Sequence, residues 1–223
     1  MSLLNLGAMV SANFAPLLPS PQGVVWARHV LWSVVLLGVG LSLVVRFSRR
    51  PHWLQPLPWL LALWAWVPGP WGASFWLGLA FQIPSLSAAF LALSVVLHRA
   101  SHRTSAYTDP PQAPQAWSLA WAALAVATGA LLVLDTFAVF DFSMYQWGFS
   151  PAAFVVALGI ALLPWLVSGT QGLRQTPVWT LLAALAVFLL TRWPTGNVWD
   201  AVLDPCLWLR ALVHGLRRPW RGR

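Results

Sequence analysis

Two aspartates near the C-terminus are the residues whose types and spacing could do chemistry. Asp200 and Asp204 stand four residues apart in the segment NVWDAVLDPCLWLR, which runs from Asn197 in a chain that has five acidic residues in all. They could be catalytic carboxylates. They also stand where helices are expected to begin, because Asn197 followed by Asp200 fits an N-cap with an acid in the first turn, and Asp204 followed by Pro205 fits a second cap and helix start. Both interpretations stay open.

Two further acids and a basic residue belong to the same candidate cluster. The candidate catalytic residues are Asp135, Asp141, Asp200, Asp204 and Arg192. Asp135 falls at the end of an apolar segment, where the helix dipole disfavours a negative charge, so we expect a cationic partner such as Arg192 or Arg28. The alternative is that these acids are ordinary loop residues and helix caps.

His98 and His102 have the helical spacing that can bind one metal ion or a haem. They are the candidate cofactor-binding residues. No Glu exists to complete a ligand set, and the lone cysteine, Cys206, lies elsewhere in the sequence. Because Arg99 and Arg103 alternate with the histidines, a helix end attracted to anionic lipid explains the same residues. We therefore expect no metal and no cofactor.

The composition decides which solvent surrounds these residues. The chain of 223 residues is 59% hydrophobic and 8% charged, with a mean hydropathy of +0.69, whereas soluble domains are about half apolar and about one quarter charged. This composition predicts an integral membrane protein. Every basic residue is arginine and every acid is aspartate, which we interpret as codon bias of a GC-rich bacterial source. The predicted location is the bacterial inner membrane.

The hydrophobic pattern predicts an all-α fold, a polytopic bundle of six to seven transmembrane helices. Proline and glycine in PGPWG, residues 68–72, end one span, and Pro84 should kink another. The repeat of Ala153, Ala157 and Ala161 predicts a smooth helix face for close packing. The expected spans are residues 30–45, 53–67, 74–97, 117–134, 151–168, 177–191 and 198–216. A single bundle, 24–216, would follow a non-cytoplasmic tail, 1–23, and precede a basic cytoplasmic tail, 217–223.

Arginine placement predicts the orientation of the bundle. Ten arginines would lie on one side if seven spans are present, and two on the other. The first group is Arg46, Arg49, Arg50, Arg99, Arg103, Arg174, Arg217, Arg218, Arg221 and Arg223, and the second is Arg28 and Arg192. The positive-inside rule then places the N-terminus outside and the C-terminus in the cytoplasm. Arg210 would lie midway along the last span and should snorkel toward the surface. An alternative is that residues 198–216 lie in the membrane interface.

The seventeen tryptophans suggest two aromatic belts at the membrane surfaces. The expected outer belt is Trp26, Trp71, Trp147, Trp193 and Trp199, and the expected inner belt is Trp53, Trp117, Trp165, Trp179 and Trp220.

Three classes of function remain open at this level. The first is a non-catalytic subunit or assembly factor of a larger inner-membrane complex, with other membrane subunits as partners and anionic lipids at the cytoplasmic arginines. The second is a small transporter or channel, for which the polar residues within spans are few: Gln82, Thr128 and Arg210. The third is a membrane enzyme that acts on a lipid-linked substrate at the outer surface with the candidate acids and arginines. The absence of P-loop, G-x-S-x-G and H-E-x-x-H motifs favours a protein that is not an enzyme, and the scattered arginines do not suggest nucleic-acid binding.

Overall fold

The computed structural model describes residues 18–46, 54–104, 119–168 and 176–217, and the regular secondary structure of this part of the chain is helical, without strands. The all-α prediction is therefore confirmed. The main helices are α2 (Pro21–Arg46), α3 (Leu57–Trp64), α4 (Ala73–Phe81), α5 (Leu86–Thr104), α6 (Leu119–Thr136), α8 (Pro151–Ser168), α10 (Thr176–Thr191) and α12 (Pro205–Arg217). Three short elements lie between them: η2 (Gly69–Trp71), α7 (Met144–Trp147) and α11 (Val198–Val202). Of the predicted tails 1–23 and 217–223, residues 1–17 and 218–223 lie outside the described residues. Helix α2 begins at Pro21, inside the predicted N-terminal tail, and α12 includes Arg217.

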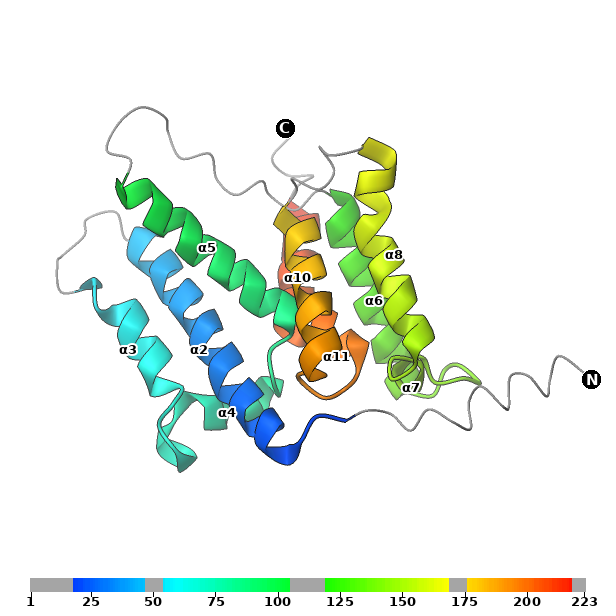
Figure 1. Cartoon of the computed structure of the whole chain (residues 1–223), viewed down its shortest axis with the longest axis horizontal. Helices are drawn as coiled ribbons and strands as arrows, with labels where there is room; N and C mark the ends of the chain where they lie inside the picture. Colours follow the sequence, from blue (N-terminus) through cyan, green and yellow to red (C-terminus); the bar gives the residue numbers. More distant parts are fainter. Residues whose placement is uncertain (1–17, 47–53, 105–118, 169–175, 218–223) are drawn as a thin grey trace, which may run out of the picture.

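Successive long helices alternate in direction (Figure 1). Helices α2, α5 and α8 run upward in this view, and α3, α6 and α10 run downward. Helix α4 and the short elements α7 and α11 lie at the lower end, where α12 begins after α11. This arrangement is an up-and-down bundle whose irregular, polar connections α7 and α11 share one end.

Helix α2 is the one helix, within the described ranges, that is both long and apolar enough to cross a membrane by itself, over Pro21–Val44. Four other helices are apolar but shorter over their apolar part, at Leu86–Arg99, Ala120–Thr136, Pro151–Leu166 and Thr176–Thr191. Three of them match the predicted spans 117–134, 151–168 and 177–191 within a few residues, and Leu86–Arg99 overlaps the second half of the predicted span 74–97.

Two predicted spans differ from the helices that form. The segment 53–67 contains only the eight-residue α3, which ends before the turn at PGPWG. The segment 74–97 does not kink at Pro84 but separates into α4 and α5, and Gln82 between them has φ +62°. Proline lacks the amide donor that would continue α4, so the chain turns and restarts as a new helix.

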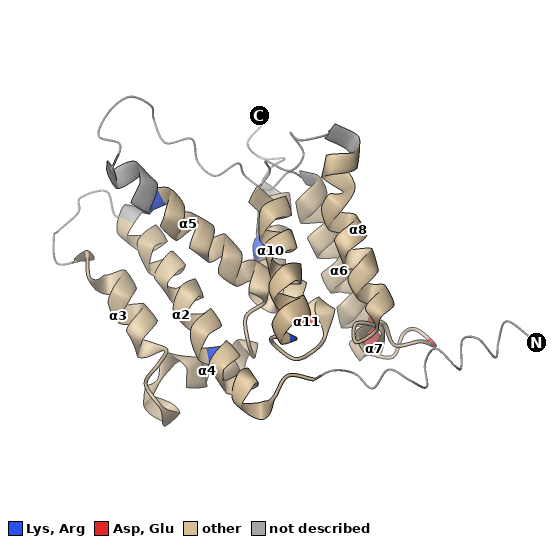
Figure 2. Ribbon diagram, viewed as in Figure 1, with Lys and Arg blue, Asp and Glu red and all other residues tan. Residues whose placement is uncertain are grey.

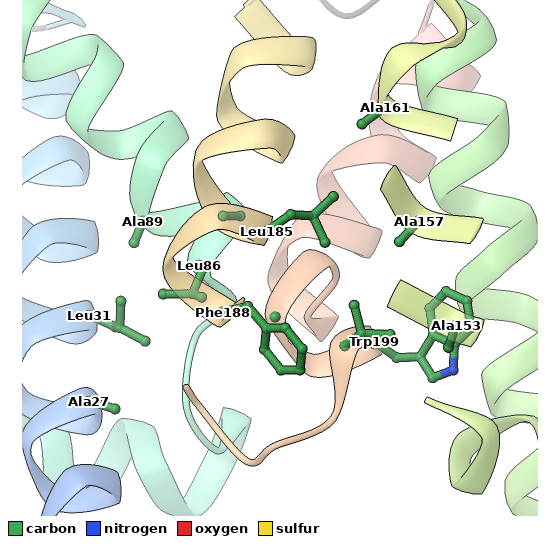
Figure 3. Packing of buried hydrophobic residues seen from close by; sticks show 13 residues of the cluster. Ala27, Leu31, Leu86, Ala89, Ala153, Ala157, Ala161, Leu185, Phe188 and Trp199 are labelled. Carbon is green, nitrogen blue, oxygen red and sulfur yellow. The ribbon is translucent and has the colours of Figure 1, made fainter. Parts of the chain in front are cut away.

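Small side chains on α8 form the centre of the bundle, as their four-residue repeat predicted. Ala153, Ala157 and Ala161 are at most 4% exposed, and Figure 3 shows them in one line along α8, with Leu185, Phe188 and Trp199 beside them. Helix α8 packs against α10, where the rings of Phe154 and Phe188 stack 6.3 Å apart. Because alanine adds little volume, the two helix backbones can approach closely.

Helix α12 packs lengthwise against α6 through a tryptophan and a glycine. The Trp208 indole N–H donates to the Val126 carbonyl, 3.1 Å away, near the middle of α6. Gly129 leaves the room for the indole ring, since a Cβ at this position would lie 2.2 Å from Trp208 Cδ1. Helix α12 therefore lies beside α6 rather than across its end.

The surface of the bundle is rich in large apolar side chains. Trp71 is 81% exposed, Trp59 61% and Leu190 84%, and Figure 2 shows a ribbon with almost no charged positions along the helices. Of the tryptophans predicted to anchor the outer surface, Trp199 is instead a core residue, 6% exposed, whose indole N–H donates to the Met144 carbonyl at 2.9 Å. Trp53, Trp117 and Trp220 lie outside the described residues.

Candidate functional site

Asp204 joins the beginnings of two helices. Its Oδ1 accepts a hydrogen bond from the Leu207 amide at 2.7 Å, which caps α12, and its Oδ2 accepts one from the Ser85 amide at 2.8 Å. Ser85 itself caps α5, because its hydroxyl accepts from the Ala88 amide at 3.0 Å. The carboxylate is 7% exposed and lies where the positive ends of both helix dipoles meet, which compensates its charge. The predicted cap at Asp204 is confirmed, and its second partner lies 119 residues away in the chain.

Asp200 forms a different kind of contact, with side chains only. Its Oδ2 accepts hydrogen bonds from the Tyr145 hydroxyl at 2.7 Å and the Thr195 hydroxyl at 2.5 Å. Burial of Tyr145, together with its hydrogen bond and repulsion from the negative Asp200, raises the pKa of the phenol to about 12. Tyr145 is therefore a protonated donor at neutral pH. Both donors are neutral, so the Asp200 charge is hydrogen-bonded but not balanced by them.

Asn197 attaches this cluster to α7. Its Oδ1 accepts from the Trp199 amide at 2.9 Å and caps α11, as the sequence predicted, while its Nδ2 donates to the Tyr145 carbonyl at 2.8 Å. The side chain is fully buried. Gly148 provides the space for it, because a Cβ there would lie 2.0 Å from Asn197 Oδ1.

Asp135 is paired with backbone rather than with an arginine, which corrects the predicted partner. Its carboxylate accepts hydrogen bonds from the amides of Met144 at 3.0 Å and Tyr145 at 2.8 Å and from the Ser143 hydroxyl at 3.1 Å. These donors form the beginning of α7, where a negative charge is favoured. The charge that is unfavourable at the end of α6 is thus stabilised by the start of the next helix.

The other two catalytic candidates lie apart from this network. Asp141 is exposed in the connection between α6 and α7, and it forms no hydrogen bond or ion pair with another described residue of the candidate cluster. Arg192 has φ +58° and lies with its guanidinium carbon 5.3 Å from the Phe188 ring centre. Within the described residues Arg192 forms no ion pair with an aspartate, and its buried Nε has no hydrogen-bond partner. The predicted pairing of Arg192 with an acid is therefore not formed.

The histidine pair lies on α5, as expected, but only part of it is described. His98 and His102 are both within the helix, and the side chain of His102 lies outside the described part. No group of three or more potential metal ligands occurs among the residues whose placement is described. Cys206 is exposed on α12. Arg210, which the sequence placed midway along the last span, is exposed on α12.

A cavity of about 310 Å³, lined by both apolar and polar side chains, brings part of the predicted cluster together. It lies between α2, the break that separates α4 from α5, and the break that separates α11 from α12. Its polar lining residues are Arg28, Gln82, Thr195, Asp200 and Asp204. Of the residues that the sequence placed on the outer side, Arg28, Asp200 and Asp204 line the cavity, whereas Asp135, Asp141 and Arg192 do not.

Sequence reasoning missed Tyr145 and Thr195, which hold Asp200. Tyr145 is 55 residues from Asp200 in the chain, and nothing in its local pattern marks it. Thr195 is five residues from Asp200, in a connection whose shape depends on left-handed conformations at Arg192 and Gly196, φ +58° and +87°. The glycine and the nearby threonine were the available signals.

Comparison with known proteins gives no relative: no protein-family model, no curated protein and no solved structure matches this chain.

Proposed function

We propose that this chain is a non-catalytic, polytopic protein of the bacterial inner membrane that serves as a subunit or assembly factor of a larger membrane complex. The observation that carries the proposal is how the acids are used. Both carboxylate oxygens of Asp204 accept hydrogen bonds from amides at the starts of α5 and α12. Both oxygens of Asp135 accept hydrogen bonds from donors at the start of α7. A catalytic carboxylate needs an oxygen that can reach substrate.

The membrane part of the proposal rests on the surface of the bundle. Exposed leucine, valine, phenylalanine and tryptophan side chains cover helices α3, α4, α8 and α10. Soluble monomers rarely expose contiguous apolar patches of more than a few hundred Å². A lipid environment, with further membrane subunits against part of this surface, is the setting in which these side chains are stable.

The proposed topology has seven crossings, with α4 and α5 forming one and α11 and α12 another. The alternating helix directions support it (Figure 1), as does the arginine bias that would place the N-terminus outside. The bond from Trp208 to Val126 supports a crossing by α12 rather than an interfacial helix, because it joins α12 to the middle of α6. The cytoplasmic arginines would then contact anionic lipids.

A small transporter is the second candidate, favoured by the cavity between two interrupted helices. In many transporters the exposed beginnings of such half-helices bind the substrate. Here Asp204 already occupies the beginnings of both α5 and α12. This use of the two dipoles favours a structural role for the break over an anion pathway. A membrane enzyme acting on a lipid-linked substrate is the third candidate.

The test compares Asp204→Asn and Asp200→Asn with the wild type in native membranes. A structural role predicts that these changes lower the amount of folded protein and of the complex that contains it, in proportion to each other. An enzyme or transporter would instead lose activity while folded protein and complex stay at wild-type amounts. Asp141→Asn is the control, because Asp141 is exposed and outside the network.

A further inference from the structure

The cavity between α2 and the two helix breaks contains an arginine, Arg28, that forms no ion pair with a described residue. Arg28 belongs to α2, and its side chain passes close to Gly78 of α4. A Cβ added at Gly78 would lie 3.3 Å from the Arg28 Cδ. Within the described ranges Arg28 forms no hydrogen bond or ion pair, although Asp200 and Asp204 line the same cavity. The side chain is half-buried. A partly buried cation that faces a cavity without a partner is expected to attract an anion.

The two carboxylates of the cavity differ in what they can offer a ligand. Asp204 uses both oxygens on backbone amides at two helix starts, so its charge is compensated locally. Asp200 uses only Oδ2, and its two donors are neutral hydroxyls. Its Oδ1 accepts no hydrogen bond from a described residue. Besides the capping carboxylate of Asp204, the cavity therefore offers one positive group, Arg28 from α2, and one negative group, Asp200 from α11.

The rim and the size of the cavity indicate an amphiphile. Phe81, Gln82 and Pro205 line the cavity and are exposed, so a ligand can enter between them. Trp76 and Leu79 of the adjoining α4 are 58% and 68% exposed. At about 30 Å³ for each water-sized group, the volume holds at least about ten non-hydrogen atoms. A charged headgroup fits inside, and its apolar part can lie along α4.

Gln82 adds a strained backbone at the mouth of the cavity. Its φ of +62° is unusual for a residue other than glycine, and its carbonyl accepts a hydrogen bond from the Trp32 indole at 3.1 Å. This contact fixes the turn between α4 and α5 and leaves the Gln82 side chain at the cavity. Such conformations cluster at ligand sites.

We propose that this cavity binds a zwitterionic group, with an oxyanion at Arg28 and an ammonium at Asp200, and that its source is the headgroup of an aminophospholipid. A free zwitterion such as an amino acid shares this chemistry. The proposal does not depend on whether the protein is a subunit, a transporter or an enzyme.

The test measures thermal unfolding of the full chain in detergent by tryptophan fluorescence. The probes are phosphatidylethanolamine and phosphatidylglycerol of matched acyl chains, soluble phosphoethanolamine, glycine and inorganic phosphate. We expect phosphatidylethanolamine to raise the melting temperature and phosphatidylglycerol to have little effect. Stabilisation by phosphoethanolamine or glycine at similar concentrations would identify a soluble zwitterion as the source, and stabilisation by the lipid alone would identify a headgroup.

Matched variants assign the effect to the cavity. Arg28→Gln and Asp200→Asn should each weaken binding at least tenfold, whereas Arg210→Gln, at an exposed position that does not line the cavity, should bind as the wild type does. Asparagine keeps an oxygen that accepts from Tyr145 and Thr195, so Asp200→Asn decides the matter if Arg28→Gln does not fold.

The proposal is overturned if no zwitterion stabilises the wild type, if phosphatidylglycerol or phosphate acts equally well, or if Asp200→Asn binds with unchanged affinity. It is also overturned if Arg28→Gln and Asp200→Asn are strongly coupled in stability without ligand, since the two side chains would then form an ion pair with each other.

Discussion

Replacing Asp204 with alanine removes a side chain that connects the starts of α5 and α12. The amides of Ser85 and Leu207 would lose their acceptors in a place that is almost closed to water, since Ser85 is fully buried and Asp204 is 7% exposed. Loss of a helix cap costs about 0.5 to 2 kcal/mol, and hydrogen bonds to charged groups contribute about 1.5 to 3 kcal/mol each. One lost cap, at Leu207, and one lost bond to a charged group, at Ser85, together predict a loss of about 2 to 5 kcal/mol. Asp204→Asn keeps one acceptor oxygen and should lose about half of this.

The assay is reversible unfolding in mixed micelles, followed by tryptophan fluorescence, with Asp141→Ala as the matched control. The exposed Asp141 should change the free energy of unfolding by less than about 0.5 kcal/mol. The reasoning is refuted if Asp204→Ala is as stable as Asp141→Ala, because the two bonds would then contribute nothing. An Asp204→Asn variant that is as unstable as the alanine variant would show that charge, rather than the number of acceptors, is what matters.

Three other changes test separate parts of the structure. Gly129→Val should destabilise the packing of α12 on α6 by about 1 to 3 kcal/mol, because Trp208 must move; unchanged stability would argue against this contact. Because the pKa of Tyr145 is raised, its hydrogen bond to Asp200 contributes fully to the free energy of unfolding below pH 10, and this contribution is lost as the pH rises through about 12. Of the two tyrosines in the chain, one should therefore ionise near pH 12 in absorbance difference spectra, and Tyr145→Phe should remove that phase. A cysteine added after Arg223 in a Cys206→Ser background should react with an impermeant maleimide only when the cytoplasmic face is open; labelling of intact cells would contradict the seventh crossing.

Local sequence patterns predicted the helix starts well. Asn197 and Asp204 act as caps, and α11 and α12 separate at Pro205, because a cap and a proline act on residues that are near in the chain. The alanine repeat on α8 likewise predicted a buried face, since small residues at helical spacing suit only a close neighbour. These features depend on few residues each.

Partners that are far apart in the chain could not be predicted. Asp135 was expected to need an arginine, but three donors from residues 143–145 are closer. Pro84 was expected to bend a helix, but Asp204 holds the Ser85 amide and a new helix starts there. Trp199 resembled a surface anchor by composition and is buried because α7 returns over it to accept its indole N–H. Each outcome depends on which elements meet, and periodicity carries no information about that.

The measurement that tests the central claim most directly is purification of the tagged chain from its native membrane into nanodiscs, followed by mass spectrometry of intact assemblies. The proposal predicts a stable assembly in which other membrane proteins accompany the 24.5 kDa chain in fixed ratio. The contradicting result is a chain that is recovered alone even in the mildest detergent and that turns over or transports a substrate. It would exclude the proposed role as a non-catalytic subunit or assembly factor.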